Sequence, residues 1–207
     1  MGAIGAASTG AYLAGLGTGL SLIVAIGAQN AFVLKQGLLR QHVFWVCLFC
    51  AVSDAVLIAA GVAGAGAIAE RAPWFLAAMR WGGAAFLIWY GARSARAAWR
   101  GGETLRAAGA APPSLAATLA TIAALTWLNP HVWLDTVVLL GAVSSTWPDR
   151  LSFALGAMSG SFLFFFALGY GARLLAPVFA RPLAWRVLDG LVALVMWSIA
   201  AALIFRG

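Results

Sequence analysis

The chain has 207 residues, of which 63% are hydrophobic and only 9% are charged, and its formal net charge is +7. So few charges cannot cover the surface of a soluble domain, and basic residues at the ends of apolar segments do not form the basic face of a nucleic-acid binder. Several apolar runs of about 18 or more residues are long enough to cross a hydrocarbon core of about 30 Å as helices. The composition therefore predicts an all-α polytopic membrane protein in contact with lipid, with no nucleic-acid partner.

Six apolar segments follow one another along the chain, and each predicts one transmembrane helix. They span residues 11–34, 43–67, 74–92, 115–143, 151–176 and 183–205. Glycines recur at a spacing of four, at Gly15 and Gly19 and again at Gly156 and Gly160. This spacing is typical of membrane helices whose backbones approach each other closely.

The first segment contains the string GAQNAFVL, in which Gly27, Gln29 and Asn30 interrupt the apolar run. We predict a helix break at Gly27, because polar backbone at membrane depth is tolerated only where it faces protein or water. These two amides, and Asn129 in the fourth segment, either join neighbouring helices by hydrogen bonds or bind a substrate, and the sequence favours neither role.

The second segment carries a carboxylate and two cysteines. Asp54 lies eleven residues after Val43, about 16 Å along a helix, and therefore near mid-membrane. A charge there costs about 2.5–3.5 kcal/mol on insertion scales, so we favour a functional role over a buried structural carboxylate. Cys47 and Cys50 form a C-x-x-C, which in a soluble βαβ context indicates redox chemistry. In an apolar helix, two small buried residues are the favoured interpretation.

The fourth segment contains TWLNPHVWLDT, where a helix break, a histidine and an aspartate occur together. Pro130 has no N–H to donate, so a helix must kink or part at this point. Asn129 precedes the proline and is driven away from helical angles. His131 and Asp135 are four residues apart and share a face if the helix resumes. We predict a site here, with His131 either satisfying carbonyls freed at the break or passing protons to Asp135.

The two halves of the chain resemble each other weakly, with Asn30 aligning with Asn129. Three helices per repeat force the second copy upside down, and interrupted helices at matching positions of inverted repeats indicate a transporter site. We therefore expect one membrane domain over 1–207. It consists of repeat 1 at about 11–92, a cytoplasmic loop at about 93–114 and repeat 2 at about 115–205, with helices 1 and 4 interrupted.

Basic residues are distributed unequally between the two sides of the predicted bundle. One side carries Lys35, Arg40, Arg93, Arg96, Arg100, Arg106, Arg173, Arg181 and Arg186, whereas the other carries Arg71, Arg80, Arg150 and Arg206. The positive-inside rule then places the first set in the cytoplasm and both termini outside.

Two charges remain inside the third and sixth segments. Arg80 and Asp189 are expected to pair with each other or to extend toward the interface, and neither is expected to bind substrate. Apart from the C-x-x-C, the sequence has no metal-ligand cluster, nucleophile elbow or phosphate loop. It therefore predicts neither an enzyme nor a bound metal or cofactor.

The strings GAQNAFVLKQG, CAVSDAVLIAAG and TWLNPHVWLDT, in this order and spacing, resemble the lysine exporter (LysE) family and are most similar to its arginine-exporter branch. The similarity covers nearly the whole chain. It implies export of arginine or lysine across the bacterial inner membrane, with two functional intramembrane aspartates that correspond to Asp54 and Asp135.

Elementary electrostatics adds a mechanism to this resemblance. Moving a cation outward against an inside-negative potential costs about 2.3 kcal/mol per 100 mV, and proton entry in exchange is the simplest driver. A membrane thiol oxidoreductase using Cys47 and Cys50 is one rival hypothesis, and a passive cation or amino-acid channel is another. The sequence does not distinguish arginine, lysine and an analogue as the substrate. It also leaves open the transport stoichiometry and the oligomeric state, which includes a homo-oligomer.

Overall fold

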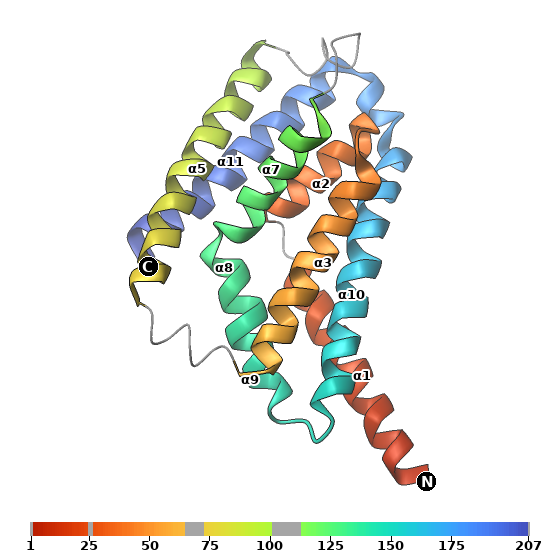
Figure 1. Cartoon of the computed structure of the whole chain (residues 1–207). Helices are drawn as coiled ribbons and strands as arrows, with labels where there is room; N and C mark the ends of the chain where they lie inside the picture. Colours follow the sequence, from red (N-terminus) through yellow and green to blue (C-terminus); the bar gives the residue numbers. More distant parts are fainter. Residues whose placement is uncertain (1, 25–26, 65–72, 101–112, 207) are drawn as a thin grey trace.

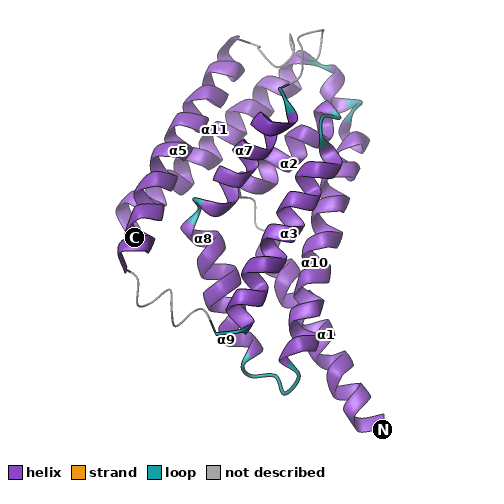
Figure 2. Ribbon diagram, viewed as in Figure 1, coloured by secondary structure: helices purple, strands orange, loops and turns teal. Residues whose placement is uncertain are grey.

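The computed structural model describes residues 2–24, 27–64, 73–100 and 113–206, and within these ranges it contains helices, turns and loops but no β-strand (Figure 1; Figure 2). The helices are α1 (Gly2–Ile23), α2 (Ala28–Leu39), α3 (Val43–Val62), α5 (Pro73–Arg100), α7 (Leu115–Trp127), α8 (Pro130–Trp133), the π-helix η1 (Leu134–Leu139), α9 (Leu140–Ser144), α10 (Arg150–Gly171), the 3-10 turns η2 (Ala172–Leu175) and η3 (Val178–Ala180), and α11 (Pro182–Arg206).

Three helices in the described part of the chain are long and apolar enough to cross a membrane, namely Val43–Val62, Arg150–Leu175 and Pro182–Phe205. Two bent pairs add up to two further crossings: Ser8–Ile23 with Ala28–Leu39, bent by 83°, and Leu115–Trp127 with Pro130–Ser144, bent by 62°. The chain is thus a multi-pass helical membrane protein in which the first and fourth predicted helices are interrupted. The predicted crossing at 74–92 lies within α5, which is not among these spans, so a sixth crossing stays a prediction.

The structure also moves one predicted boundary. Helix α5 continues to Arg100, so residues 93–100 are helical and do not belong to the loop predicted at 93–114. The sequence there, RSARAAWR, is rich in alanine and arginine, which are strong helix formers and sustain the helix beyond the predicted span. Most of the remaining loop, residues 101–112, lies outside the described residues, as does the end of the predicted second segment, 65–67.

Helix pairs pack closely where glycines remove side chains from the interface. Helix α1 lies along α10, and a Cβ at Gly15 or at Gly156 would overlap backbone atoms of Phe153 or Tyr12 respectively (Figure 1). The predicted role of the small residues at a spacing of four is therefore confirmed. Helix α5 lies along α11, and α3 packs against α10.

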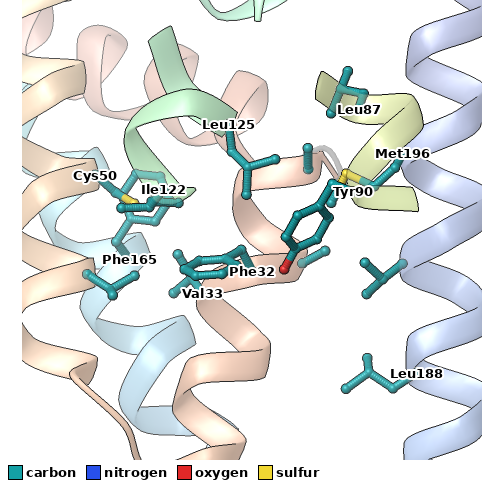
Figure 3. Close-up of a cluster of buried hydrophobic side chains, with 14 of the residues drawn as sticks. Phe32, Val33, Cys50, Leu87, Tyr90, Ile122, Leu125, Phe165, Leu188 and Met196 are labelled. Atoms are coloured by element: carbon teal, nitrogen blue, oxygen red, sulfur yellow. The ribbon is translucent and has the colours of Figure 1, made fainter. Parts of the chain in front are cut away.

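The bundle is apolar on both its inner and outer surfaces, as expected of a protein surrounded by lipid. On α11, Leu188, Val192 and Met196 are buried, whereas Leu191 and Leu194 are exposed on the outer surface. Buried aromatic and aliphatic side chains from α2, α5, α7, α10 and α11 form the larger core cluster, in which Phe32 and Tyr90 point toward each other (Figure 3).

Candidate functional site: a cavity between two helix breaks

A cavity of about 280 Å³ lies where the α1–α2 and α7–α8 breaks face each other. Its wall includes seven of the eight residues that the sequence singled out: Gly27, Gln29, Asn30, Asp54, Asn129, His131 and Asp135. The eighth, Pro130, shapes the second break without lining the cavity. The two helix breaks and the middle of α3, which are far apart in sequence, therefore lie around one cavity.

The break at Asn129 and Pro130 follows from the chemistry of the two residues. Asn129 is extended, with φ −99° and ψ 105°, and its side-chain oxygen accepts a hydrogen bond from the His131 backbone N–H at 3.2 Å. Pro130 occupies the first turn of α8, where its missing N–H costs nothing. The Trp133 indole donates to the carbonyl oxygen of Trp127 at 3.2 Å and so satisfies a backbone group freed at the end of α7.

The first break, between α1 and α2, is stabilised by different hydrogen bonds. The Asn30 amide donates to the Ile23 carbonyl oxygen at 2.6 Å and caps the end of α1 from the following helix. Gly27 precedes α2 with φ −114° and ψ 175°, and no side chain caps the first N–H groups of α2. The Gln29 amide nitrogen is buried and has no hydrogen-bond partner among the described residues. Because the first N–H groups of a helix have no partner within it, this end of the cavity can offer donors to a ligand.

Asp54 lies deep in the bundle, with only 3% of its surface exposed. Its Oδ2 accepts a hydrogen bond from the Ser161 hydroxyl of α10 at 2.7 Å. Sequence analysis missed Ser161. The sequence shows only a hydroxyl directly after Gly160, in a helix that also carries Ser152 and Ser159, and this pattern does not single out Ser161. The neighbouring Ser53 accepts from the Trp127 indole at 3.2 Å, which ties α3 to the end of α7.

Asp135 reaches the same cavity from the opposite break and is half-buried, and His131 is exposed on the cavity wall. Both lie on the helix that resumes after Pro130, so the predicted shared face is present. This helix widens to a π-helix over Leu134–Leu139, and π-bulges frequently occur at functional sites. No lysine or arginine lines the cavity in the described part of the chain. Two carboxylates in such a wall select for a cation.

The two cysteines are buried and free, and both lie on α3, with Cys50 beside Gln29 of the first break. The Cys47 thiol donates to the Phe165 carbonyl oxygen of α10 at 3.2 Å, and a Cβ on Gly169 would collide with this sulfur. These contacts assign Cys47 to helix packing. Within the described residues, no group of three or more His, Cys, Asp and Glu side chains is placed to hold a metal ion.

The expected pairing of Arg80 with Asp189 is wrong. Arg80 donates from Nε and Nη2 to the carbonyl oxygens of Leu203 and Ile204, at 2.5 and 2.7 Å, and so satisfies backbone groups near the end of α11. Asp189 instead forms an ion pair with Lys35 of α2 at 2.6 Å. Sequence spacing could not reveal this partner, because 154 positions separate the two residues and only tertiary packing joins them.

Comparisons with known proteins identify the family to which the chain is similar. The family model of the LysE type translocators matches residues 20–207. The "Arginine exporter protein ArgO" of Salmonella schwarzengrund (strain CVM19633) is 43% identical over 95% of this chain and 94% of its own length. The protein of the same name from Yersinia enterocolitica serotype O:8 / biotype 1B (strain NCTC 13174 / 8081) is 44% identical over 95% of this chain and 97% of its own length. No solved structure matches the chain.

Proposed function

The chain belongs to the LysE family of translocators, and from this premise we propose that it exports a basic amino acid, L-arginine or L-lysine, across the bacterial inner membrane. Its family and its relatives are translocators and exporters rather than enzymes, and the relatives named above are arginine exporters. The substrate of this chain is inferred from those names and from the cavity.

The observation that carries the proposal is a cavity that Asp54 and Asp135 both line, with no lysine or arginine among its described lining residues. A guanidinium or ammonium group supplies the positive charge that two desolvated carboxylates require. Asn30 and Asn129 hold the helix breaks in place around this charge. A basic amino acid fits this cavity because its side chain provides the positive charge that no lysine or arginine among the described lining residues provides.

The substrate carboxylate requires positive potential and N–H donors, and helix N-termini at the cavity carry the former. At the start of α8, Pro130 has no N–H and the His131 and Val132 N–H groups already donate to Asn129, so this end contributes its partial positive charge. We assign the donors for the carboxylate to the start of α2, the matching end of the opposite break. The α2 end has no side-chain cap and includes the unpartnered Gln29 amide, which supports this assignment.

Proton exchange supplies the driving force in this proposal. A carboxylate binds either a cation or a proton, so competition at Asp54 or Asp135 couples outward movement of substrate to inward movement of protons. The Ser161 hydroxyl donates to Asp54 and orients its carboxylate toward the cavity when no substrate is bound. His131, at the cavity wall, is the group that exchanges protons with Asp135.

The proposed architecture is two inverted repeats of three helices, at about 11–92 and 115–205, with both termini outside. A twofold axis that exchanges the two halves would superpose the contact of α1 with α10 on the contact of the α7–α9 segment with α3. The α5–α11 contact and the α3–α10 contact would each be superposed on themselves. All of these pairs are in contact, which supports the repeat. The basic end of the bundle then faces the cytoplasm.

Uptake of labelled arginine and lysine into inverted membrane vesicles tests the function. An imposed pH gradient should raise the accumulated arginine at least several-fold above vesicles without the protein. Equal uptake with and without the gradient would refute proton coupling, and equilibration without accumulation would favour a channel. Absence of specific arginine and lysine uptake would refute the proposed substrate class.

A further inference from the structure

A second cavity of about 300 Å³ lies at the other end of α2, toward the basic end of the bundle. Its wall includes Lys35, Gln36, Arg93, Arg96 and Arg100, and it contains no aspartate or glutamate among the described residues. The Gln36 amide oxygen is buried at this wall and has no hydrogen-bond partner in the described part of the chain. An unused acceptor beside several cations is suited to a ligand that carries both N–H donors and a carboxylate.

Helix α2 connects the two cavities. Its first residues line the cavity between the breaks, and Lys35 and Gln36 line the second cavity. Between these levels, the ring of Phe32 packs edge-on against Tyr90 of α5, with centroids 6.3 Å apart and planes at 65° (Figure 3). Both rings also line the second cavity, and together with the core around them they form a wall between the two cavities.

The second component of this wall is the ion pair between Lys35 and Asp189, with Nζ and Oδ1 2.6 Å apart and side chains 9% and 1% exposed. Lys35 lines the second cavity and Asp189 lies behind it on α11. A ligand entering from the basic end therefore meets Lys35 first, and it reaches Asp189 only when Lys35 moves.

We propose that the Lys35–Asp189 pair is a second substrate subsite, at which the cationic group of a basic amino acid binds Asp189 and its α-carboxylate binds Lys35. This inference rests on the proposed function. It assigns an entry site to the cytoplasmic side of the same path, and this site opens when Lys35 and Asp189 exchange each other for the substrate as ion-pair partner. Arg93 and Arg96 lie on the same wall and attract the carboxylate end of the substrate, and Gln36 accepts from its cationic end.

The exchange is electrostatically balanced, which is why an amino acid can open the pair where a simple cation cannot. Separating a buried ion pair is strongly unfavourable, because each charge loses a close counter-ion in the protein interior. A substrate with both a cation and a carboxylate gives each partner a new counter-ion at the moment the pair parts. Separation of the Lys35–Asp189 pair therefore depends on the presence of substrate.

The double variant Lys35→Met/Asp189→Asn tests the subsite without leaving a lone buried charge. We expect the arginine KM measured at the face on which the basic end lies to rise about tenfold or more, while the KM at the opposite face, from counterflow in vesicles of opposite orientation, changes less than twofold. Arg80→Met is the matched control, since it removes another side-chain contact to α11 outside both cavities, and it should leave both KM values unchanged. An equal change at both faces, or none at either, would overturn the subsite.

The wild-type protein in the same vesicles separates the two proposals. If wild type does not transport arginine or lysine, the proposed function fails; if it transports and the double variant shows no one-sided shift, only the subsite fails. Lys35→Arg provides a second test that keeps the charge and therefore the fold. Its guanidinium binds Asp189 through two hydrogen bonds and resists exchange, so the same one-sided rise in KM is expected. A purely structural pair would tolerate this substitution with both KM values unaltered.

Discussion

Replacement of Asp54 by asparagine separates the electrostatic role of this residue from its packing role. Asparagine has nearly the same shape, and its carbonyl oxygen still accepts the hydrogen bond that Ser161 donates to Asp54 at 2.7 Å. The substitution therefore removes a charge from a site that is 97% buried, since 3% of Asp54 is exposed, and leaves the surrounding contacts in place.

The magnitude follows from the lost charge. A hydrogen bond to a charged group contributes about 1.5–3 kcal/mol, so loss of the carboxylate should weaken cation binding about 10- to 150-fold. Removing a mid-membrane charge also removes an insertion cost of about 2.5–3.5 kcal/mol. Asp54→Asn should therefore reach the membrane at wild-type levels or above, with arginine uptake into inverted vesicles reduced at least tenfold at low substrate concentration.

Two variants control this measurement. Asp149→Asn removes another aspartate, at the start of α10 and outside the cavity, and should leave uptake within twofold of wild type. Ser161→Ala keeps the Asp54 charge and should reduce uptake less than Asp54→Asn does. Wild-type uptake by Asp54→Asn, at equal protein amount in the membrane, would refute the role of this carboxylate in substrate binding.

Further predictions concern the second carboxylate, the break, the thiols and acid stability. Asp135→Asn should also reduce arginine uptake at least tenfold without loss of protein from the membrane, and unchanged uptake would refute its role. Gly83→Val should destabilise the fold by about 1–3 kcal/mol, seen as a lower Tm in detergent, because a side chain there would overlap the backbone carbonyl at the end of α7. Cys47→Ala/Cys50→Ala should retain uptake within a few-fold of wild type, whereas loss of uptake in a folded variant would revive a thiol-based mechanism. Hydrogen bonds from the Ser152 backbone and from serine hydroxyls lower the pKa of Asp149 from 3.8 to about 2, so its stabilising effect is present above pH 3.8 and is lost as the pH falls toward 2. Thermal unfolding should accordingly show a larger loss of Tm over this interval for wild type than for Asp149→Asn, and equal losses would contradict the capping role.

Much of the candidate site was predictable because its residues violate membrane rules locally. Asp54 and Asp135 are charges in apolar runs, and Asn129 with Pro130 is a break in a helix that is otherwise long enough to span. Each of these signals depends only on residues close in sequence. Ser161 gave no such signal, because a single hydroxyl in a membrane helix satisfies its own backbone as readily as a distant carboxylate.

The Lys35–Asp189 pair shows the opposite case. Lys35 follows an apolar stretch, and sequence analysis interpreted it as a loop cation at the cytoplasmic boundary. Helix α2 in fact continues to Leu39 and carries Lys35 into the bundle, where α11 supplies its counter-ion. The partner of a buried charge depends on the rotation and tilt of two helices, and these are set by packing with the rest of the bundle.

The sequence alone determined that this protein is a multi-pass helical membrane protein with interrupted first and fourth helices, because hydrocarbon requires long apolar helices and a proline or polar break is visible in the local pattern. It also identified the two aspartates as the unusual groups. Only the tertiary structure decided that both aspartates line one cavity, that Ser161 holds Asp54, and that Arg80 and Asp189 have different partners. The physical reason is that insertion energies act on each segment separately, whereas a shared site depends on how the helices, once inserted, pack against one another.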